Sequence, residues 1–334
     1  MNATILSPPP PRPATPANLR IIDLAPDLSS VRRAVLEGLS ATPKTLPAWL
    51  FYDAEGSRLF ERICAQPEYY PTRTELAILH AHGHDIAATL GAGCRLVELG
   101  SGSHRKARTL LRVLADPDGY VAIDISGEQL REAVCALARE FPELPVTGIV
   151  GDYGEGDALP LEDTPGDGPL VGFFPGSTIG NMEPSAAEEF LRGWAGRLAG
   201  GGMLVGVDLV KDTTVLDAAY NDAAGVTAAF NLNMLAHVNR ELGSDFDLAA
   251  FRHRAFFDRA RSRVEMHLES LRHQRVDLGS HSVAFAAGET IHSENSCKYT
   301  IEGFRALATR AGFRPQRVWT DDRGWFSVHY LAAG

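Results

Sequence analysis

The chain has 334 residues, of which 45% are hydrophobic and 22% charged, which is ordinary for a globular protein with room for two domains. Its formal net charge of −10, without a local cluster of Lys and Arg, argues against a surface for nucleic acid or anionic membranes. The four cysteines lack metal-ligand spacing, and no apolar run approaches the ~18 residues of a membrane span. We therefore expect a cytoplasmic protein without a metal site, acting on a small molecule.

Residues 1–19 are rich in proline and poor in residues that could form a core, so they are predicted to be a disordered leader. Helical spacing follows over Ser29–Leu39 and again over Trp49–Ala65. Thr72-x-x-Glu75 has the pattern of a capping box and precedes apolar residues that are spaced for one helix face up to Leu90. The N-terminal fifth of the chain is thus predicted to be mainly helical.

The stretch Leu96–Ser103 is the most informative of the chain, because an apolar strand there ends in a glycine turn and opens into a helix that carries Lys106. Gly100 and Gly102 allow positive φ and a close approach of the backbone to a ligand, and the helix N-terminus offers free N–H groups. Arg105 occupies the place of the third glycine of the dinucleotide fingerprint, which disfavours a nicotinamide dehydrogenase. Glu98 and the two glycines suit the E-x-G-x-G loop of S-adenosylmethionine (SAM) methyltransferases.

Two further strands support a SAM site. Tyr120–Asp124 ends in a carboxylate at about the ~20-residue distance at which an acid meets a ribose diol. Thr147–Val150 is followed by Gly151, Asp152 and Tyr153, the place where such enzymes hold the adenine amine. Three signals in strand order are more specific than any one of them.

Strands and helices alternate from residue 96 to residue 210, which predicts a parallel, doubly wound α/β sheet. Helical spacing then continues from Lys211 to Phe257 and gives way to period-two segments, so that 211–298 is predicted to be an inserted α+β piece. After a helix over Ile301–Arg310, two strands around Asp321–Gly324 form a predicted antiparallel hairpin, the habit of class I (Rossmann-like) methyltransferases.

The predicted architecture has two domains. Residues 74–210 and 299–334 form a SAM-binding domain, and residues 20–73 and 211–298 form a second domain that covers the substrate. Ligands of such sheets bind beyond the carboxyl ends of the central strands, so the segment Pro175–Asn181 is expected to line the site. Asn181 offers an amide that both donates and accepts hydrogen bonds. Glu294–Ser296 reads by itself as a polar loop between the insertion and the sheet.

Six motifs together resemble the histidine-specific methyltransferases of ergothioneine biosynthesis, in order and from about residue 20 to the C-terminus. They are Tyr52-Asp53-x-x-Gly56-Ser57, Pro67–Glu75, Glu98–Ser103, Gly176–Asn181, Tyr220–Asp222 and Glu294-x-Ser296-Cys297-Lys298-Tyr299. The resemblance implies a monomeric, SAM-dependent enzyme that methylates the α-amino nitrogen of L-histidine three times and forms hercynine.

Carried over by position, the resemblance implies a site for each part of the reaction. It assigns Tyr69, Gly176, Asn181 and Tyr220 to the amino acid backbone of the substrate, Met266 to the ring pocket, and Glu294 with Ser296 to the imidazole. It assigns Tyr52 and Asn181 to catalysis. The cofactor positions are Gly100, Ser101, Gly102, Lys106, Asp124, Asp152 and Tyr153. Tyr299 stands where a phenylalanine is common in the family.

Two other functions remain open at this point. A methyltransferase of the same fold could act on another amino acid or on an indole precursor of an alkaloid, although Glu294 argues against such a substrate. A catalytically silent, SAM-binding interaction protein would be expected to lose Asn181 or a pocket tyrosine, and this chain has kept them.

Overall fold

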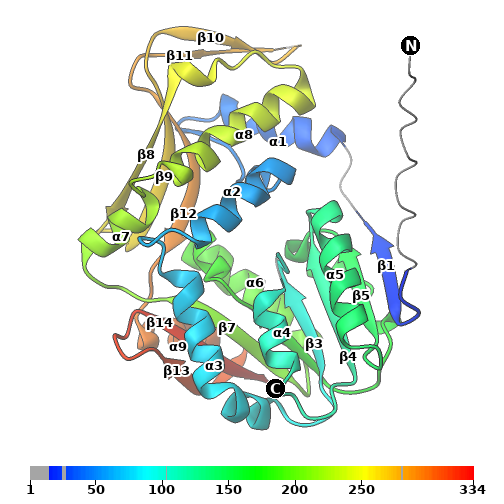
Figure 1. Ribbon diagram of the computed structural model, residues 1–334. Helices are drawn as coiled ribbons and strands as arrows, with labels where there is room; N and C mark the ends of the chain where they lie inside the picture. Colours follow the sequence, from blue (N-terminus) through cyan, green and yellow to red (C-terminus); the bar gives the residue numbers. More distant parts are fainter. Residues whose placement is uncertain (1–14, 25–27, 103, 280) are drawn as a thin grey trace, which may run out of the picture.

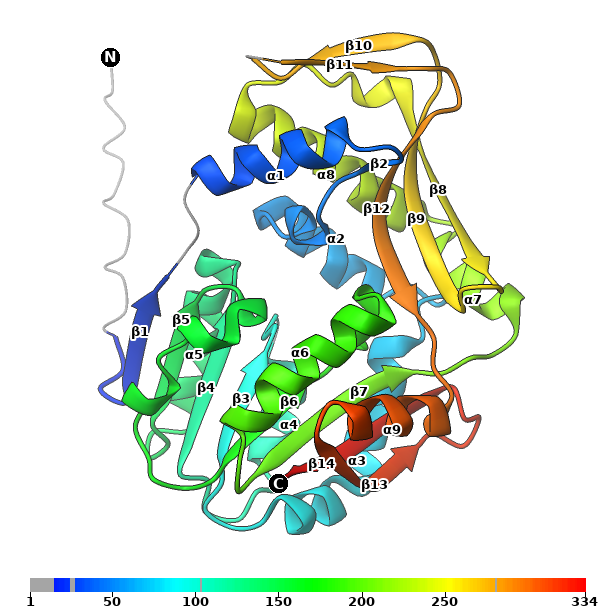
Figure 2. The ribbon, with the colours of Figure 1, turned by 180° about the vertical axis from the view of Figure 1, so that it is seen from behind.

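The computed structural model describes residues 15–24, 28–102, 104–279 and 281–334. The molecule has two parts. The lower layer, at the bottom of Figure 1, is a large sheet with the helices that flank it, and the upper layer is a smaller sheet with its own helices. Figure 2 shows the same two layers from behind. Most of the predicted leader, residues 1–14, lies outside the described residues.

The large sheet has eight strands in the order β1-β5-β4-β3-β6-β7-β14-β13. The first six in this order run parallel, and β14 runs antiparallel to both of its neighbours, β7 and β13. This arrangement confirms the predicted parallel α/β sheet with a C-terminal antiparallel hairpin. The strands are β1 (Leu19–Asp23), β3 (Arg95–Leu99), β4 (Gly119–Asp124), β5 (Val146–Val150), β6 (Leu170–Phe174), β7 (Gly202–Asp208), β13 (Phe313–Thr320) and β14 (Phe326–Ala333).

Helices cover both faces of this sheet, which is why its central strands are almost wholly apolar. On one face, α3 (Pro71–Leu90), α4 (Arg105–Leu111) and α5 (Gly127–Glu140) bury residues such as Leu79, Leu110 and Val134 in one core. On the other face, α6 (Pro184–Arg197) and α9 (Ile301–Arg310) contribute to a second core. The short helices η2 (Tyr153–Ala158) and η3 (Leu161–Asp163) lie on the connection between β5 and β6.

The position of β1 corrects the predicted boundaries of the leader and of the second domain. Residues 19–23 pair in parallel with β5 at the edge of the large sheet, not with the small sheet. The side-chain amide of Asn18 donates to the carbonyls of Ala138, Phe141 and Leu144, which ties the chain to the end of α5. The sequence Leu19–Asp23 is too short and irregular in polarity to reveal this pairing.

The upper layer has a four-stranded sheet in the order β2-β12-β9-β8 and a separate β10-β11 hairpin. The prediction of helical structure up to Phe257 is wrong, because β8 begins at Phe251 and pairs with β9. A third core joins this sheet to its helices. The elements are α1 (Leu28–Ser40), β2 (Lys44–Thr45), η1 (Ala48–Phe51), α2 (Ala54–Cys64), α7 (Thr213–Tyr220), α8 (Val226–Leu242), η5 (Leu248–Ala250), β8 (Phe251–Asp258), β9 (Arg263–Ser270), β10 (Gln274–Asp277), β11 (Ser282–Phe285) and β12 (Thr290–Cys297).

Two of the segments by which the chain passes between the layers follow β7 and β12. They run side by side, since Leu209 and Tyr299 form an isolated parallel bridge. The division into two folding domains remains a prediction. Among the described residues, no helix combines the length and apolar character needed to cross a membrane.

Candidate functional site

A cavity of about 780 Å³ lies between the carboxyl ends of β3 to β6 and the elements of the upper layer. The structure brings all of the predicted site residues together in its lining, although they come from both layers. These residues are Tyr52, Tyr69, Gly100, Ser101, Gly102, Lys106, Asp124, Asp152, Tyr153, Gly176, Asn181, Tyr220, Met266, Glu294 and Ser296.

The glycine loop after β3 has the backbone conformation that the sequence predicts. Gly100 and Gly102 have φ values of 74° and 45°, a region that residues with side chains rarely adopt. A Cβ atom at Gly100 would make only an ordinary van der Waals contact, at 3.5 Å from the ring of Tyr153, so the positive φ is what requires glycine here. The loop therefore presents backbone to a ligand at close range.

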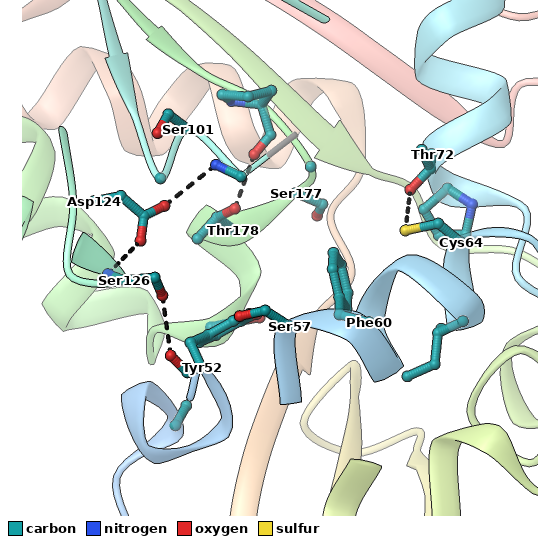
Figure 3. A pocket seen from close by; sticks show the side chains of 18 of the residues that line it. Tyr52, Ser57, Phe60, Cys64, Thr72, Ser101, Asp124, Ser126, Ser177 and Thr178 are labelled. Atoms are coloured by element: carbon teal, nitrogen blue, oxygen red, sulfur yellow. Dashed lines mark hydrogen bonds between the residues drawn. The ribbon is translucent and has the colours of Figure 1, made fainter. Parts of the chain in front are cut away.

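Asp124, at the end of β4, binds the backbone of this loop and of the turn that follows β4. One carboxylate oxygen accepts from the Gly102 N–H at 3.2 Å and the other accepts from the Ser126 N–H at 2.8 Å. The Ser126 hydroxyl in turn donates to the Tyr52 carbonyl, which joins the two layers (Figure 3). An ionised carboxylate has about four acceptor positions, so Asp124 keeps capacity for the hydroxyl groups of a ligand.

Asp152 and Tyr153 follow β5 on the next connection along the sheet. The Asp152 carboxylate caps η2 by accepting from the Gly154 N–H at 2.7 Å. The Tyr153 ring packs edge-on against Phe174, with the ring centroids 5.6 Å apart. Burial, Asp124 and Asp152 raise the pKa of Tyr153, so its hydroxyl stays neutral.

Two buried polar atoms near the glycine loop have no hydrogen-bond partner among the described residues, and sequence reasoning missed one of them. They are the Ser101 hydroxyl and the Nε2 atom of His104. His104 is 2% exposed and its Nδ1 atom lies 3.2 Å from the carboxylate of Glu98, which also binds the Tyr120 hydroxyl. Unpaired buried polar atoms are costly, so this end of the cavity fits a ligand with polar groups of its own.

Glu75 has a different role from the predicted capping box. Tyr70 is the N-cap of α3 without a side-chain cap, and Thr72 donates to the sulfur of Cys64 instead. Glu75 is fully buried, binds the ammonium of Lys106 at 2.6 Å and accepts from the Gly176 N–H at 2.9 Å. Glu75 thus holds the turn after β6 against α4, the helix that follows the glycine loop. Lys106 lines the cavity, and the carboxylate of Glu75 balances its positive charge.

Glu294 and Met266 form the far end of the cavity. They are register partners on β12 and β9, so the interpretation of Glu294–Ser296 as a loop is wrong. Burial raises the pKa of Glu294 to about 7, although Lys298 and a hydrogen bond with Asn181 oppose the increase. Asn181 is the last residue of η4 (Thr178–Asn181), which follows β6. A carboxyl group that titrates near neutral pH in a buried pocket is a characteristic of functional sites.

Aromatic side chains make the walls between the two ends. The ring of Tyr69 meets Tyr220 edge-on at 6.4 Å, and the ring of Tyr52 meets Phe60 in the same way at 6.1 Å. Burial, reinforced by neighbouring acidic groups, raises the pKa of Tyr52 and Tyr69 well above the ordinary range. Both phenols are neutral at physiological pH, so they offer hydroxyl groups and ring faces rather than anionic bases.

Potential metal ligands cluster outside this cavity. Glu265, His267 and His292 each bring one ligand atom within 4.8 Å of the others. However, the Glu265 carboxylate already accepts from Arg263 through one oxygen and lies 2.9 Å from His267 through the other. We assign no metal to this cluster, because its only anionic ligand is neutralised by a guanidinium.

Known proteins resemble this chain over most of its length. A family model described as histidine-specific, SAM-dependent methyltransferase matches residues 31–333. A histidine N-alpha-methyltransferase of Mycolicibacterium smegmatis is 45% identical over 90% of this chain and 94% of its own. Ergothioneine biosynthesis protein 1 of Neurospora crassa is 31% identical over 87% of this chain and 33% of its own length. A 4-dimethylallyltryptophan N-methyltransferase of Claviceps purpurea is 31% identical over 57% of this chain and 59% of its own.

Proposed function

The chain belongs to the family of histidine-specific, SAM-dependent methyltransferases, and we propose that it methylates the α-amino nitrogen of L-histidine three times to form hercynine, a step of ergothioneine biosynthesis. The observation that carries this proposal is the pair of Glu294 and Ser296, which line the cavity from the same strand, β12, with Glu294 half-buried and Ser296 buried. A carboxylate and a hydroxyl side by side match the two nitrogens of an imidazole.

The cofactor end of the cavity fits SAM. The backbone of Gly100 lines the cavity. The free acceptor positions of Asp124 and the unpaired polar atoms of Ser101 and His104 suit a ligand with hydroxyl and amino groups. We propose that Gly100, Ser101, Gly102 and Lys106 hold its amino acid part, Asp124 its ribose, and Asp152 with Tyr153 its adenine. When bound, SAM supplies a methyl group that is already activated by its sulfonium.

The substrate end is proposed to hold histidine by its backbone and by its ring. Tyr69, Asn181 and Tyr220 are assigned to the carboxylate and the amine, beside the turn at Gly176. The Tyr220 hydroxyl donates its proton to Ser296, so toward the substrate it can only accept, and we assign it to the amine. Met266 lines the ring pocket, where Glu294 accepts an imidazole N–H. A buried carboxylate without its N–H partner costs on the order of 1–3 kcal/mol, which would discriminate against amino acids that lack a ring N–H.

The chain's own residues have mainly to align the amine and exclude water. An α-amine has a pKa of about 8, so a proton must leave before the first two transfers. Asn181 is proposed to orient the deprotonated amine, since η4 places its amide beside Glu294. The ring faces of Tyr52 and Tyr69 would stabilise the quaternary ammonium product by roughly 0.5–2 kcal/mol.

An indole substrate is the second candidate, since the Claviceps relative is named for a tryptophan derivative. An indole N–H could meet Glu294, but an indole has no second nitrogen to face Ser296. We therefore favour histidine over an indole amino acid. The silent SAM-binding protein is disfavoured, because the cavity is open and holds every predicted catalytic side chain.

Mass spectrometry of the purified protein with SAM and each common amino acid tests the proposal. The expected result is the addition of three methyl groups to histidine alone. Equal turnover of tryptophan or tyrosine would overturn histidine specificity, and binding of SAM without any methylated product would favour the silent protein. We further propose a cytoplasmic monomer, which sedimentation in solution and cell fractionation would test.

A further inference from the structure

A buried ion pair lies directly behind the ring end of the cavity. Asp208, at the end of β7, is fully buried, and Lys298, just after β12, is 3% exposed. Their carboxylate and ammonium groups are 2.8 Å apart. Lys211 and the Tyr70 hydroxyl bind the same carboxylate from the other side. A buried charge is retained at a cost, so the position of Lys298 next to the site calls for an explanation.

Each proton of the Lys298 ammonium group has an acceptor. Besides the carboxylate of Asp208, its Nζ atom lies 2.7 Å from the Ser296 hydroxyl and 3.2 Å from the Tyr220 hydroxyl. An ammonium group has three protons and no acceptor, so each of the three contacts takes one proton. The ammonium is therefore held in one orientation by two residues of the cavity wall.

This geometry determines what Ser296 can offer to a ligand. Its oxygen accepts from Lys298 and, at 2.7 Å, from the Tyr220 hydroxyl. A serine hydroxyl has two acceptor positions and one proton, so both acceptor positions are filled. Within the described part of the chain, no acceptor takes the remaining proton, and Ser296 lines the cavity. Ser296 can then act toward a ligand only as a donor.

We propose that Lys298, held by Asp208, is a positioning residue that makes Ser296 a hydrogen-bond donor, so that the pocket selects a ring with one bare nitrogen and one N–H. The bare nitrogen faces Ser296 and the N–H faces Glu294. A neutral imidazole meets both conditions, whereas an imidazolium has no bare nitrogen. The inference rests on the proposed function and specifies the form of the substrate ring that this site takes.

The same ammonium acts on Glu294. The groups that face Glu294 are Lys298, the Asn181 amide, and the hydroxyls of Tyr52, Tyr69 and Tyr220. Lys298 is the cation of this set and favours the ionised carboxylate. Its removal would raise the pKa of Glu294 and move the acid limb of the kcat/KM profile for histidine to higher pH.

The experiment compares Lys298→Met with Lys211→Met. Both remove a cation that binds Asp208, but Lys211 contacts neither Ser296 nor Tyr220. We expect Lys298→Met to raise the KM for histidine roughly tenfold or more, with a smaller change in kcat, and to shift the acid limb upward. Lys298→Arg keeps the charge and should restore the position of the acid limb. Lys211→Met should leave both readouts near those of the wild type.

Ring analogues provide a readout that needs no variant. Each of the two pyrrolylalanines keeps one ring nitrogen of histidine as an N–H and replaces the other by CH. The wild type should show a KM at least tenfold higher for both than for histidine. Lys298→Met should reduce this discrimination, because Ser296 regains an acceptor position.

Three results are decisive. Equal KM values of the wild type for histidine and a pyrrolylalanine would overturn the inference while leaving histidine methylation intact. Matching effects of Lys298→Met and Lys211→Met on KM, acid limb and discrimination would show that the pair is merely structural. Failure of the wild type to methylate histidine at all would instead overturn the proposed function. If Lys298→Met does not fold, Asp208→Asn/Lys298→Met removes both charges together, and the wild-type test with the analogues still decides.

Discussion

The two ends of the cavity are built in different ways. At the cofactor end, Gly100, Asp124 and Asp152 lie at or just past the ends of strands of the large sheet, and their contacts run mostly through backbone N–H groups. At the ring end, Glu294, Ser296 and Tyr220 come from the upper layer and depend on a buried ion pair whose members are 90 residues apart. One end is set by local turns, and the other by charges that the tertiary structure brings together.

The largest expected effect tests this contrast through stability. Replacement of Asp208 by alanine would leave Lys211 and Lys298 buried side by side without their carboxylate. Loss of one partner of a buried ion pair typically costs about 3–5 kcal/mol. We therefore expect the free energy of unfolding, measured with urea, to fall by about that amount. Asp124→Ala is the control at the cofactor end, and an equal loss of stability there would contradict the distinction.

Glu294 and Asn181 separate recognition from chemistry at the ring end. Glu294→Ala should chiefly weaken the binding of histidine, by about 1.5–3 kcal/mol, because a charged hydrogen bond is lost, and this loss should appear as a higher KM. It should also relax selectivity toward apolar aromatic amino acids. Asn181→Ala should instead lower kcat at saturating histidine, because the amine loses its alignment.

Steady-state kinetics of both variants with histidine and with tryptophan would make this comparison. Glu294 would have to act in the chemical step if Glu294→Ala lowered kcat as strongly as Asn181→Ala and left KM unchanged. The assignment of the two roles would then be wrong.

An effect of similar size is expected at the opposite end. Asp124→Ala should weaken the binding of SAM by roughly 1.5–3 kcal/mol, since a charge-assisted pair of hydrogen bonds to the ribose is lost. Isothermal titration calorimetry measures this directly. Binding of histidine to the variant saturated with SAM should be nearly unchanged, and a parallel loss of both affinities would show that the two ends are coupled.

The sequence predicted the cofactor end from its own residues, because each contact there lies next to a recognisable strand. The ring end was predicted only through the family resemblance. The segment Ser293–Ser296 lacks the apolar alternation of a strand, since its inward face contacts a polar substrate pocket. Nothing local to Lys298 points to Asp208, and the pairing exists only because β7 and β12 leave the sheets side by side.

The capping box illustrates the same limit from the other direction. The spacing of Thr72 and Glu75 fits a local helix signal, but Glu75 instead binds Lys106 and the turn after β6. A local pattern and a tertiary contact compete for the same side chain, and for the buried carboxylate of Glu75 a cation is the stronger partner. The start of β8 is hidden in the sequence for a related reason, since residues 251–257 lack a regular alternation of apolar and polar side chains and follow directly on a stretch with helical spacing.

The smallest expected effect is the pH dependence, which should differ between the two ends. Glu294, whose pKa is raised to about 7 in the free protein, binds the ring N–H more strongly when it is ionised, because the hydrogen bond is then charge-assisted. Because its protonated form dominates below that pKa, histidine affinity should fall by up to about fivefold from pH 7 to pH 6, in addition to the loss caused by protonation of the free imidazole. The affinity for SAM should change little over this range, since its proposed partners at the glycine loop are mostly backbone groups.

Calorimetric titrations at both pH values measure the two affinities, and Glu294→Gln is the control that keeps the shape of the side chain and removes the titrating group. If the wild type and Glu294→Gln lost histidine affinity in parallel, the pH dependence would belong to the substrate alone, and the ionisation of Glu294 would have no part in the recognition of the ring.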